Sequence, residues 1–139
     1  EHPTQTLLDL YTIYEHFNTT RGLTITFVGD IVNGRTVYSL SNFLYGKCKI
    51  NFCETYDFSN LPKSDIYYLT RVQRERGSIG SYQLTEEHVK EMPQDCIVMH
   101  PFPRNEEIPM WFDTDPRAKY FEQMKNGLYV RMALLLSYK

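Results

Sequence analysis

The chain has 139 residues, of which 42% are hydrophobic and 23% charged, and its formal net charge at pH 7 is −2. This length suits one domain of ordinary size with a real hydrophobic core. The near-neutral balance, with basic residues scattered apart from a cluster at 71–76, argues against nucleic acid as a partner. No apolar run is long enough to span a membrane and no export signal opens the sequence, so we expect no membrane partner. Because the sequence begins at Glu1, we expect it to be part of a longer polypeptide.

The cysteines bear on compartment and metal content. Cys48, Cys53 and Cys96 are odd in number and lack C-x-x-C spacing. This pattern favours buried, reduced thiols in a cytoplasmic protein over a disulfide framework or a metal site. We therefore expect a cytoplasmic location, no metal and no cofactor.

Hydrophobic periodicity predicts a chain of alternating helices and strands. The predicted elements are, in order, an amphipathic helix over 3–17, a strand over 23–28, a helix over 35–46, strands over 49–53 and 65–70, a short capped helix from Thr85, a strand over 95–99 and a long amphipathic helix at the C-terminus. The apolar stripe of the first helix is Leu7, Leu8, Tyr11 and Tyr14. That of the last helix is Phe121, Met124, Leu128, Met132 and Leu135. Between the last strand and this helix, residues 105–115 predict an exposed acidic loop.

This alternation indicates an α/β fold, with a doubly wound, mostly parallel sheet flanked by helices. Three of the predicted strands run into polar motifs, and the carboxyl ends of parallel strands share one edge of a sheet. The motifs are Gly34-Arg-Thr36, Thr70-Arg-Val-Gln73 and His100-Pro-Phe-Pro-Arg104. A single strand-end arginine is usually a surface ion-pair partner, but two arginines and a histidine at successive strand ends favour an anion site.

The chemistry that fits these motifs is recognition of a small dianion. Arg35 and Arg71 can each take one carboxylate, and Gln73 can add a neutral hydrogen bond. Because proline has no N–H, the backbone of Pro101 and Phe102 can offer carbonyl oxygens to an amine. This combination suits an amino dicarboxylate.

Other polar residues have weaker assignments. Glu75 and Arg76 are better suited to bracing Arg71 than to touching a ligand. His2 and Gln5 flank the start of the first helix, where an anion is favoured, although a lone terminal histidine is more often plain surface.

Several motifs together resemble those of the aspartate carbamoyltransferases. They are His2-Pro-Thr-Gln-Thr-Leu-Leu-Asp9, Val28-Gly-Asp30, Gly34-Arg-Thr-Val37, Thr70-Arg-Val-Gln73 with Glu75-Arg76, His100-Pro-Phe-Pro-Arg104 with Glu107-Ile108, Asp115-Pro-Arg117, Tyr120-Phe121 and Asn126-Gly127. The resemblance is collinear over nearly the whole chain. The sister ornithine enzymes resemble His-Pro-Cys-Gln and His-Cys-Leu-Pro at two places where this chain has His-Pro-Thr-Gln and His-Pro-Phe-Pro.

The resemblance implies carbamoyl transfer from carbamoyl phosphate to L-aspartate, an early step of pyrimidine synthesis. By that analogy Arg35 holds the α-carboxylate of aspartate, while Arg71 and Gln73 hold the β-carboxylate. His2 polarises the carbamoyl carbonyl and Gln5 contacts the same end. The catalytic set would thus be His2, Arg35 and Arg71.

Backbone carbonyls of Pro101 and Phe102 would face the amine, and four residues would give structural support. These are Glu75, Arg76, His100 and Arg104.

The resemblance also implies a domain layout and partners. Residues 1–17 would be an inter-domain helix with carbamoyl-phosphate contacts, 18–116 the aspartate-binding domain, and 117–139 a helix packing back toward a second domain. That carbamoyl-phosphate domain, on the same polypeptide, carries the phosphate loop, and the enzyme would be a homotrimer with shared active sites. We expect this chain alone to be inactive.

The chain also departs from the family's pattern. It is shorter than the family between Leu44 and Asp65 by about one helix and one strand, which is either a genuine deletion or the result of residues missing from the sequence. The alternatives are a non-catalytic homologue acting as a binding or scaffolding module, and a transferase for another amino acid.

Overall fold

A computed structural model describes residues 3–31, 34–54, 59–71 and 82–137. Its elements are α1 (Pro3–Phe17), β1 (Thr24–Val28), α2 (Arg35–Leu44), β2 (Lys49–Cys53), β3 (Ile66–Leu69), α3 (Glu86–Glu91), β4 (Ile97–Met99), the 3₁₀ helix η3 (Met110–Thr114) and α4 (Tyr120–Leu136). Every predicted helix and strand is present within a few residues of its expected position. Thr85 caps α3, as expected, by accepting the N–H of His88.

The four strands form one parallel sheet in the order β2-β1-β3-β4. The chain leaves β1 through α2 to reach β2, and then returns across β1 to β3 on its other side. This reversal is the mark of a doubly wound sheet, which confirms the expected fold class. Val28 pairs with Leu69, and Tyr68 with Met99, so the carboxyl ends of the central strands lie at one edge.

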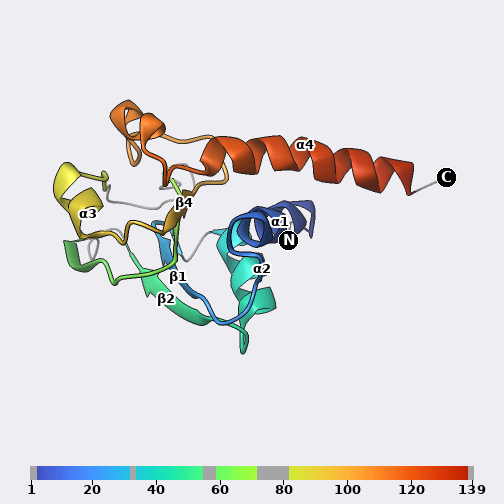
Figure 1. The fold of residues 1–139 in the computed structure, drawn as a ribbon, viewed down its shortest axis with the longest axis horizontal. Helices are drawn as coiled ribbons and strands as arrows, with labels where there is room; N and C mark the ends of the chain where they lie inside the picture. The colour runs from blue at the N-terminus through green and yellow to red at the C-terminus, as the bar shows by residue number, and fades with distance from the viewer. Residues whose placement is uncertain (1–2, 32–33, 55–58, 72–81, 138–139) are drawn as a thin grey trace.

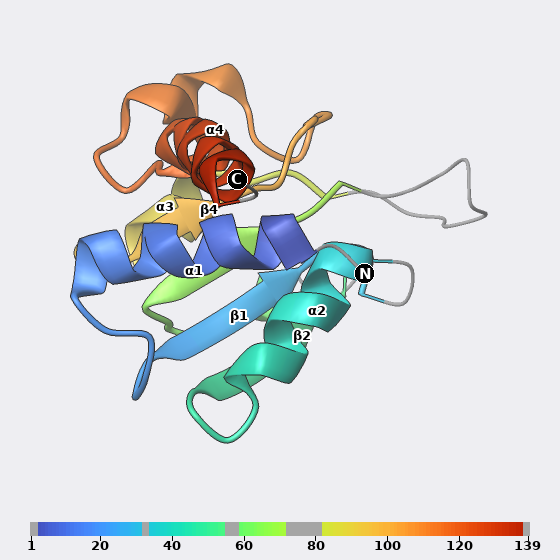
Figure 2. The ribbon, with the colours of Figure 1, turned by 90° about the vertical axis from the view of Figure 1, so that its right-hand side faces the viewer.

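Each face of the sheet has its own hydrophobic core. On one face α1 and α2 cover the side chains of Ile66 and Tyr68, and on the other α3 and the chain after β4 cover Tyr67 and Leu69 (Figures 1 and 2). All four β3 side chains are buried. A strand covered on both faces is expected to be apolar throughout, as this one is.

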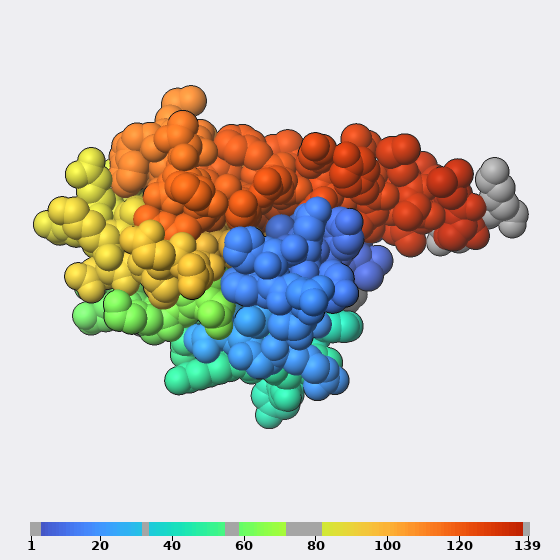
Figure 3. Space-filling view, viewed as in Figure 1, coloured from blue at the N-terminus to red at the C-terminus, as the bar shows by residue number. Residues whose placement is uncertain are grey.

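Helix α4 packs against α1 (Figure 3), and hydrogen bonds between polar side chains join the two helices. The buried residues of α4 are Tyr120, Gln123, Asn126 and Gly127. At Gly127 the two helices approach closely, because an added Cβ would lie 3.1 Å from Leu8 Cδ2. The last turns of α4 extend beyond the rest of the molecule (Figure 1).

The predicted apolar stripes of the two helices do not coincide with their buried faces. Most of the stripe of α1 is about half exposed: Leu7 46%, Tyr11 45% and Tyr14 52%. The whole stripe of α4 is exposed too, from Phe121 at 48% to Leu135 at 72%. The reason is that polar partners on the neighbouring faces, Asp9 and Gln123 among them, hold the helices together.

The expectation of an exposed acidic loop over 105–115 was only partly right, since Asn105 and Glu106 are exposed but other residues are not. Glu107, Ile108 and Phe112 in this segment are buried, and part of it is the helix η3. The apolar residues of this segment do not make a periodic pattern, although two of them, Ile108 and Phe112, complete the core on the α3 side. In the part of the chain described, no helix is long and apolar enough to cross a membrane.

Candidate functional site

The strand ends place several of the predicted residues on one edge. Arg71 follows β3, His100 follows β4, and Arg35 begins the helix that follows β1. The edge includes the point between β1 and β3 where the strand order reverses, which is where ligands bind in open α/β sheets. His2, Gln73, Glu75 and Arg76 lie outside the described residues, so their roles stay predictions.

The turn after β1 is hydrogen-bonded to Thr70, the residue that follows β3. Thr70 Oγ1 donates to the carbonyl of Val28 at 3.0 Å and accepts the N–H of Asp30 at 3.1 Å. Gly29, at φ +117°, leaves no room for a side chain, since an added Cβ would collide with Thr70. This close approach fixes the backbone from which Arg71 projects.

Arg35 stands at the first turn of α2 and is exposed. The N-cap residue is Gly34, whose lack of a side chain leaves the first N–H groups of the helix without a side-chain cap. An added Cβ at Gly34 would lie 2.6 Å from the carbonyl oxygen of Asp30, so only glycine fits the turn. A guanidinium beside uncapped helix N–H groups favours an anion.

His100 is buried and its ring has a defined tautomer. Nδ1 accepts the N–H of Phe102 at 2.9 Å, so the proton lies on Nε2, which donates to Glu107 Oε2 at 2.6 Å. Burial lowers the pKa of His100 against the opposing effect of Glu107, and the positive charges of Arg104 and Arg71 lower it further. The neutral His100 ring therefore holds the turn after β4 through its hydrogen bonds to Phe102 and Glu107.

Glu107 is the partner that makes this arrangement possible. Burial would raise the pKa of Glu107, but the hydrogen bonds from His100 and from the N–H of Asn105 outweigh it and lower the pKa. Glu107 belongs to the motif named in the sequence, yet no role was predicted for it. Glu107 follows another acidic residue, Glu106, and such a pair does not indicate in the sequence that one of the two is buried.

The turn from His100 to Arg104 is held by an aromatic cluster. The ring of Phe102 lies 5.6 Å from that of Tyr120 and 5.7 Å from that of Phe121. The Arg104 guanidinium lies over these rings and forms a two-point ion pair with Asp113, at 2.6 and 2.8 Å. Hydrogen bonding to Asp113 raises the pKa of Arg104, so the pair stays charged. Arg104 thus holds the turn through Asp113 and these rings, and the structural role that the resemblance implies for it stays a prediction.

A cavity of about 150 Å³ joins this turn to helix α1. Its lining includes Gln5, His100, Pro101 and Phe102, which are four of the predicted residues. Phe102 has φ +52°, an uncommon conformation for a residue with a side chain. Since the N–H of Phe102 is used by His100, and Pro101 has none, the polar backbone groups left on this turn are carbonyl acceptors.

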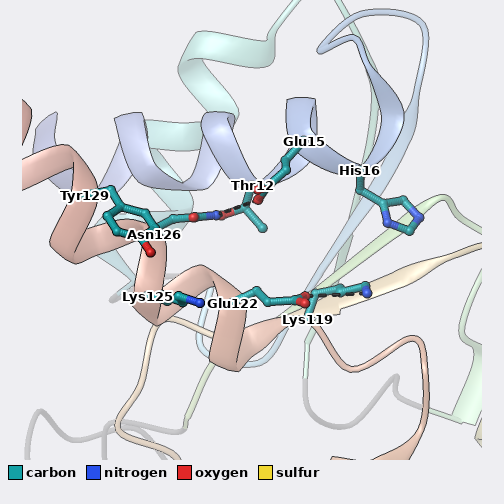
Figure 4. Close-up of a pocket in the computed structure, with 8 residues that line it drawn as sticks. All are labelled: Thr12, Glu15, His16, Lys119, Glu122, Lys125, Asn126 and Tyr129. Carbon is teal, nitrogen blue, oxygen red and sulfur yellow. Dashed lines mark hydrogen bonds and ion pairs between the residues drawn. The ribbon is translucent and has the colours of Figure 1, made fainter.

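A larger cavity, about 460 Å³, lies between α1 and α4 (Figure 4). Its charged lining is nearly balanced, with Glu15 and Glu122 against Lys119 and Lys125. None of the predicted site residues lines it, and it is away from the strand ends. Size alone therefore does not make it the functional site.

Three kinds of group lie at this edge of the sheet. The guanidinium groups of Arg35 and Arg71 can bind carboxylates, and the carbonyls of the His100–Phe102 turn can accept from an amine. The side-chain amide of Gln5 can bind a small polar group. Within the described ranges, no cluster of three or more His, Cys, Asp or Glu side chains could hold a metal ion. The arrangement is suited to binding and orienting an amino dicarboxylate beside a second small substrate.

Comparison with known proteins decides the family. The model of the aspartate/ornithine carbamoyltransferase Asp/Orn-binding domain matches residues 48–138. The chain belongs to this family. The multifunctional protein pyr1-3 of Dictyostelium discoideum is 43% identical over 97% of the chain, which spans 8% of that protein. The aspartate carbamoyltransferase catalytic subunit of Picrophilus torridus is 39% identical over 97% of the chain and 55% of its own length.

Solved carbamoyltransferase structures share the fold. Trypanosoma cruzi aspartate transcarbamoylase, in complex with carbamoyl aspartate and phosphate, superposes with a TM-score of 0.83 at 33% identity, over 97% of this chain and 53% of that one. The chain thus spans about half the length of such single-function relatives. The alignment with the Dictyostelium protein has 168 positions against 139 residues here, so at least 29 aligned positions have no counterpart in this chain.

Proposed function

We propose that the chain is the aspartate-binding part of an aspartate carbamoyltransferase. The reaction transfers a carbamoyl group from carbamoyl phosphate to L-aspartate, giving N-carbamoyl-L-aspartate and phosphate for pyrimidine synthesis. The observation that carries the proposal is the meeting of Arg35, Arg71 and the His100–Phe102 turn at one sheet edge. Relatives named as aspartate carbamoyltransferases support aspartate over ornithine as the acceptor.

Each substrate group has a proposed partner. Arg35 binds the α-carboxylate of aspartate, and Arg71 with Gln73 binds the β-carboxylate by charge-assisted hydrogen bonds. Backbone carbonyls of Pro101 and Phe102 accept hydrogen bonds from the amine and direct its lone pair at the carbamoyl carbon.

The carbamoyl end is held from the first helix. We propose that His2 donates to the carbamoyl oxygen, where negative charge develops in the transition state, and that Gln5 fixes the same group. The amine nitrogen bonds to the carbamoyl carbon, the bond from that carbon to the phosphate oxygen breaks with its electron pair, and the amine proton is lost, with phosphate as an available acceptor.

Positioning and charge stabilisation account for this chemistry without a covalent enzyme intermediate. His100 and Arg104 act indirectly, since both have partners inside the chain that hold the turn after β4. Glu75 and Arg76 are proposed to brace Arg71 in the same manner.

The partners follow from the part of the family that this chain does not span. We propose that α1 joins residues 18–116 to a carbamoyl-phosphate domain on the same polypeptide, and that residues 117–139 pack against that domain. The exposed apolar stripe on α4 supports this packing. A homotrimer with shared active sites and a cytoplasmic location complete the proposal; the absence of disulfides among the three cysteines, all described, supports the location.

The observation in favour of a different function is the shortening by at least 29 positions relative to a close homologue. A non-catalytic homologue, used for binding or scaffolding, could tolerate such a loss. A transferase for another amino acid is disfavoured, because two arginines at the edge would repel a cationic side chain such as that of ornithine.

The test is an acceptor assay on the complete polypeptide. Carbamoyl phosphate labelled in the carbamoyl carbon is supplied with aspartate, with ornithine or with no amino acid, and the products are separated. We expect labelled carbamoyl-aspartate and no labelled citrulline. Citrulline would show a different acceptor, and no product in any reaction would favour the non-catalytic homologue.

A further inference from the structure

A buried carboxyl group with no predicted role lies next to Gln5, one of the predicted site residues. Asp9, on α1, is completely buried. Its Oδ1 accepts from Gln5 Nε2 at 2.9 Å and from Gln123 Nε2 at 2.8 Å, and its Oδ2 accepts from the Tyr68 hydroxyl at 2.6 Å. One carboxyl group thereby joins α1, α4 and β3.

This geometry determines which way both glutamine amides face. An ionised carboxylate only accepts hydrogen bonds, so each glutamine must turn its NH₂ group toward Asp9 and keep its carbonyl oxygen for another partner. For Gln123 that partner is the N–H of His100, at 2.8 Å, where the turn after β4 begins. For Gln5, which lines the 150 Å³ cavity, the oxygen remains an acceptor for a ligand.

We propose that Asp9 is a positioning residue, which sets Gln5 and the His100–Phe102 turn in one alignment, so that the Gln5 oxygen faces the NH₂ group of the carbamoyl substrate while the carbonyls of the turn face the aspartate amine. The inference rests on the proposed function, because the ligand with an NH₂ group to donate is carbamoyl phosphate. Asp9 itself lies behind Gln5 and is not proposed to touch substrate.

The groups around Asp9 make its alignment sensitive to pH. Gln5 from α1 and Gln123 from α4 are uncharged, and Tyr68 from β3 is the one titratable group bonded to it among the residues described. Burial raises the pKa of Tyr68 well above its usual value, so it remains a donor, and α2 adds only the uncharged Thr36 beside it. Burial raises the pKa of Asp9 to about 7, against the effect of its three hydrogen bonds.

Protonation would put a hydrogen on an oxygen that has been accepting. One of the bonds to Gln5, Gln123 or Tyr68 must then break or reverse, and the alignment is lost. Carbamoyl-phosphate use should therefore fall as the pH drops through about 7.

Two variants of the complete polypeptide separate positioning from mere stability. In Asp9→Asn, the NH₂ group donates to the Tyr68 oxygen and reverses that bond, as a protonated carboxyl group does, so the variant mimics protonated Asp9 at every pH and does not titrate. In Asp9→Ala, both glutamines lose their acceptor. A matched control is Thr12→Val, which removes the other buried bond between α1 and α4, from Asn126 Nδ2 to Thr12 Oγ1 at 3.0 Å.

We expect Asp9→Ala to lower kcat/KM for carbamoyl phosphate about 10- to 100-fold, as a misplaced contact group does. Asp9→Asn should show at about pH 8 the lowered kcat/KM that the wild type reaches at about pH 6, and should lose the decline between these pH values. Thr12→Val should keep the wild-type kinetics and pH profile although its melting temperature falls.

Kinetics of Asp9→Ala equal to those of Thr12→Val, or a wild-type decline at low pH in Asp9→Asn, would overturn the inference. If Asp9→Ala does not fold, the pH profile of Asp9→Asn decides. Failure of the wild type to carbamoylate any acceptor overturns the proposed function and this inference with it, whereas an active wild type with unaffected variants overturns the inference alone.

Discussion

Replacing Glu107 should test whether the turn after β4 depends on one buried hydrogen-bond acceptor. In Glu107→Ala, two donors lose their acceptor: His100 Nε2, bonded at 2.6 Å, and the N–H of Asn105, bonded at 3.0 Å. The His100 side chain is only 1% exposed, so water cannot replace the lost partner. Leaving a buried donor unsatisfied costs about 1–3 kcal/mol, and we expect Glu107→Ala to lose about 3 kcal/mol of unfolding free energy.

Glu107→Gln is the matched variant, because its amide oxygen still accepts from His100. Exchanging a charged acceptor for a neutral one should cost only about 1 kcal/mol. Urea unfolding of the 139-residue chain, followed by fluorescence of Trp111 in η3, measures both changes. Equal losses in the two variants, or a loss below about 0.5 kcal/mol for alanine, would refute the reasoning.

The same pair gives a pH dependence of stability with a definite sign. The pKa of His100 is lowered in the folded chain, so the unfolded chain binds more protons as the pH falls below 6.5. The pKa of Glu107 is also lowered, so its contribution is present above 4.5 and is lost as the pH falls through the folded value. Both groups therefore make the chain less stable on acidification.

Two further predictions concern the turn after β1 and the proposed carbamoyl-phosphate domain. Gly29→Ala should lower the free energy of unfolding by about 2–4 kcal/mol, because φ +117° and a collision with Thr70 both oppose a side chain. Gly22→Ala is the control, since Gly22 has φ +74° but open space around it. It should lower the free energy of unfolding by about 1–2 kcal/mol in the same urea assay. Equal costs would show that contact with Thr70 is unimportant. N-(phosphonacetyl)-L-aspartic acid is a ligand in one of the related crystal structures. In calorimetry, its affinity for the complete polypeptide should be at least about 100-fold higher than its affinity for this chain alone, because a second domain would contribute contacts. Equal affinities would show that binding does not need a second domain.

The strands and helices were predictable because each carries its own local pattern. Apolar residues alternate or repeat within β1 and α2, and Gly29 and Gly34 mark the turns between them. The common edge for Arg71 and His100 followed from these elements, because parallel strands end together.

What could not be predicted depends on pairs far apart in the chain. Asp9 and Gln123 are 114 residues apart, and nothing in either local sequence indicates that they meet. For the same reason the apolar stripes containing Tyr11 and Leu135 did not indicate that the two helices are joined by polar residues. His100 was expected to give support, but its partner Glu107 became visible only once the segment after it was seen to be buried.

The central claim is that the edge after β3 binds aspartate, and Arg71→Ala in the complete polypeptide tests it most directly. Losing a charge-assisted contact with a carboxylate should lower kcat/KM for aspartate about 100-fold, or about 3 kcal/mol, with little change in melting temperature. Arg21→Ala, which removes an exposed arginine at the other end of β1, is the control and should keep wild-type kinetics. Unchanged aspartate kinetics in Arg71→Ala would contradict the account.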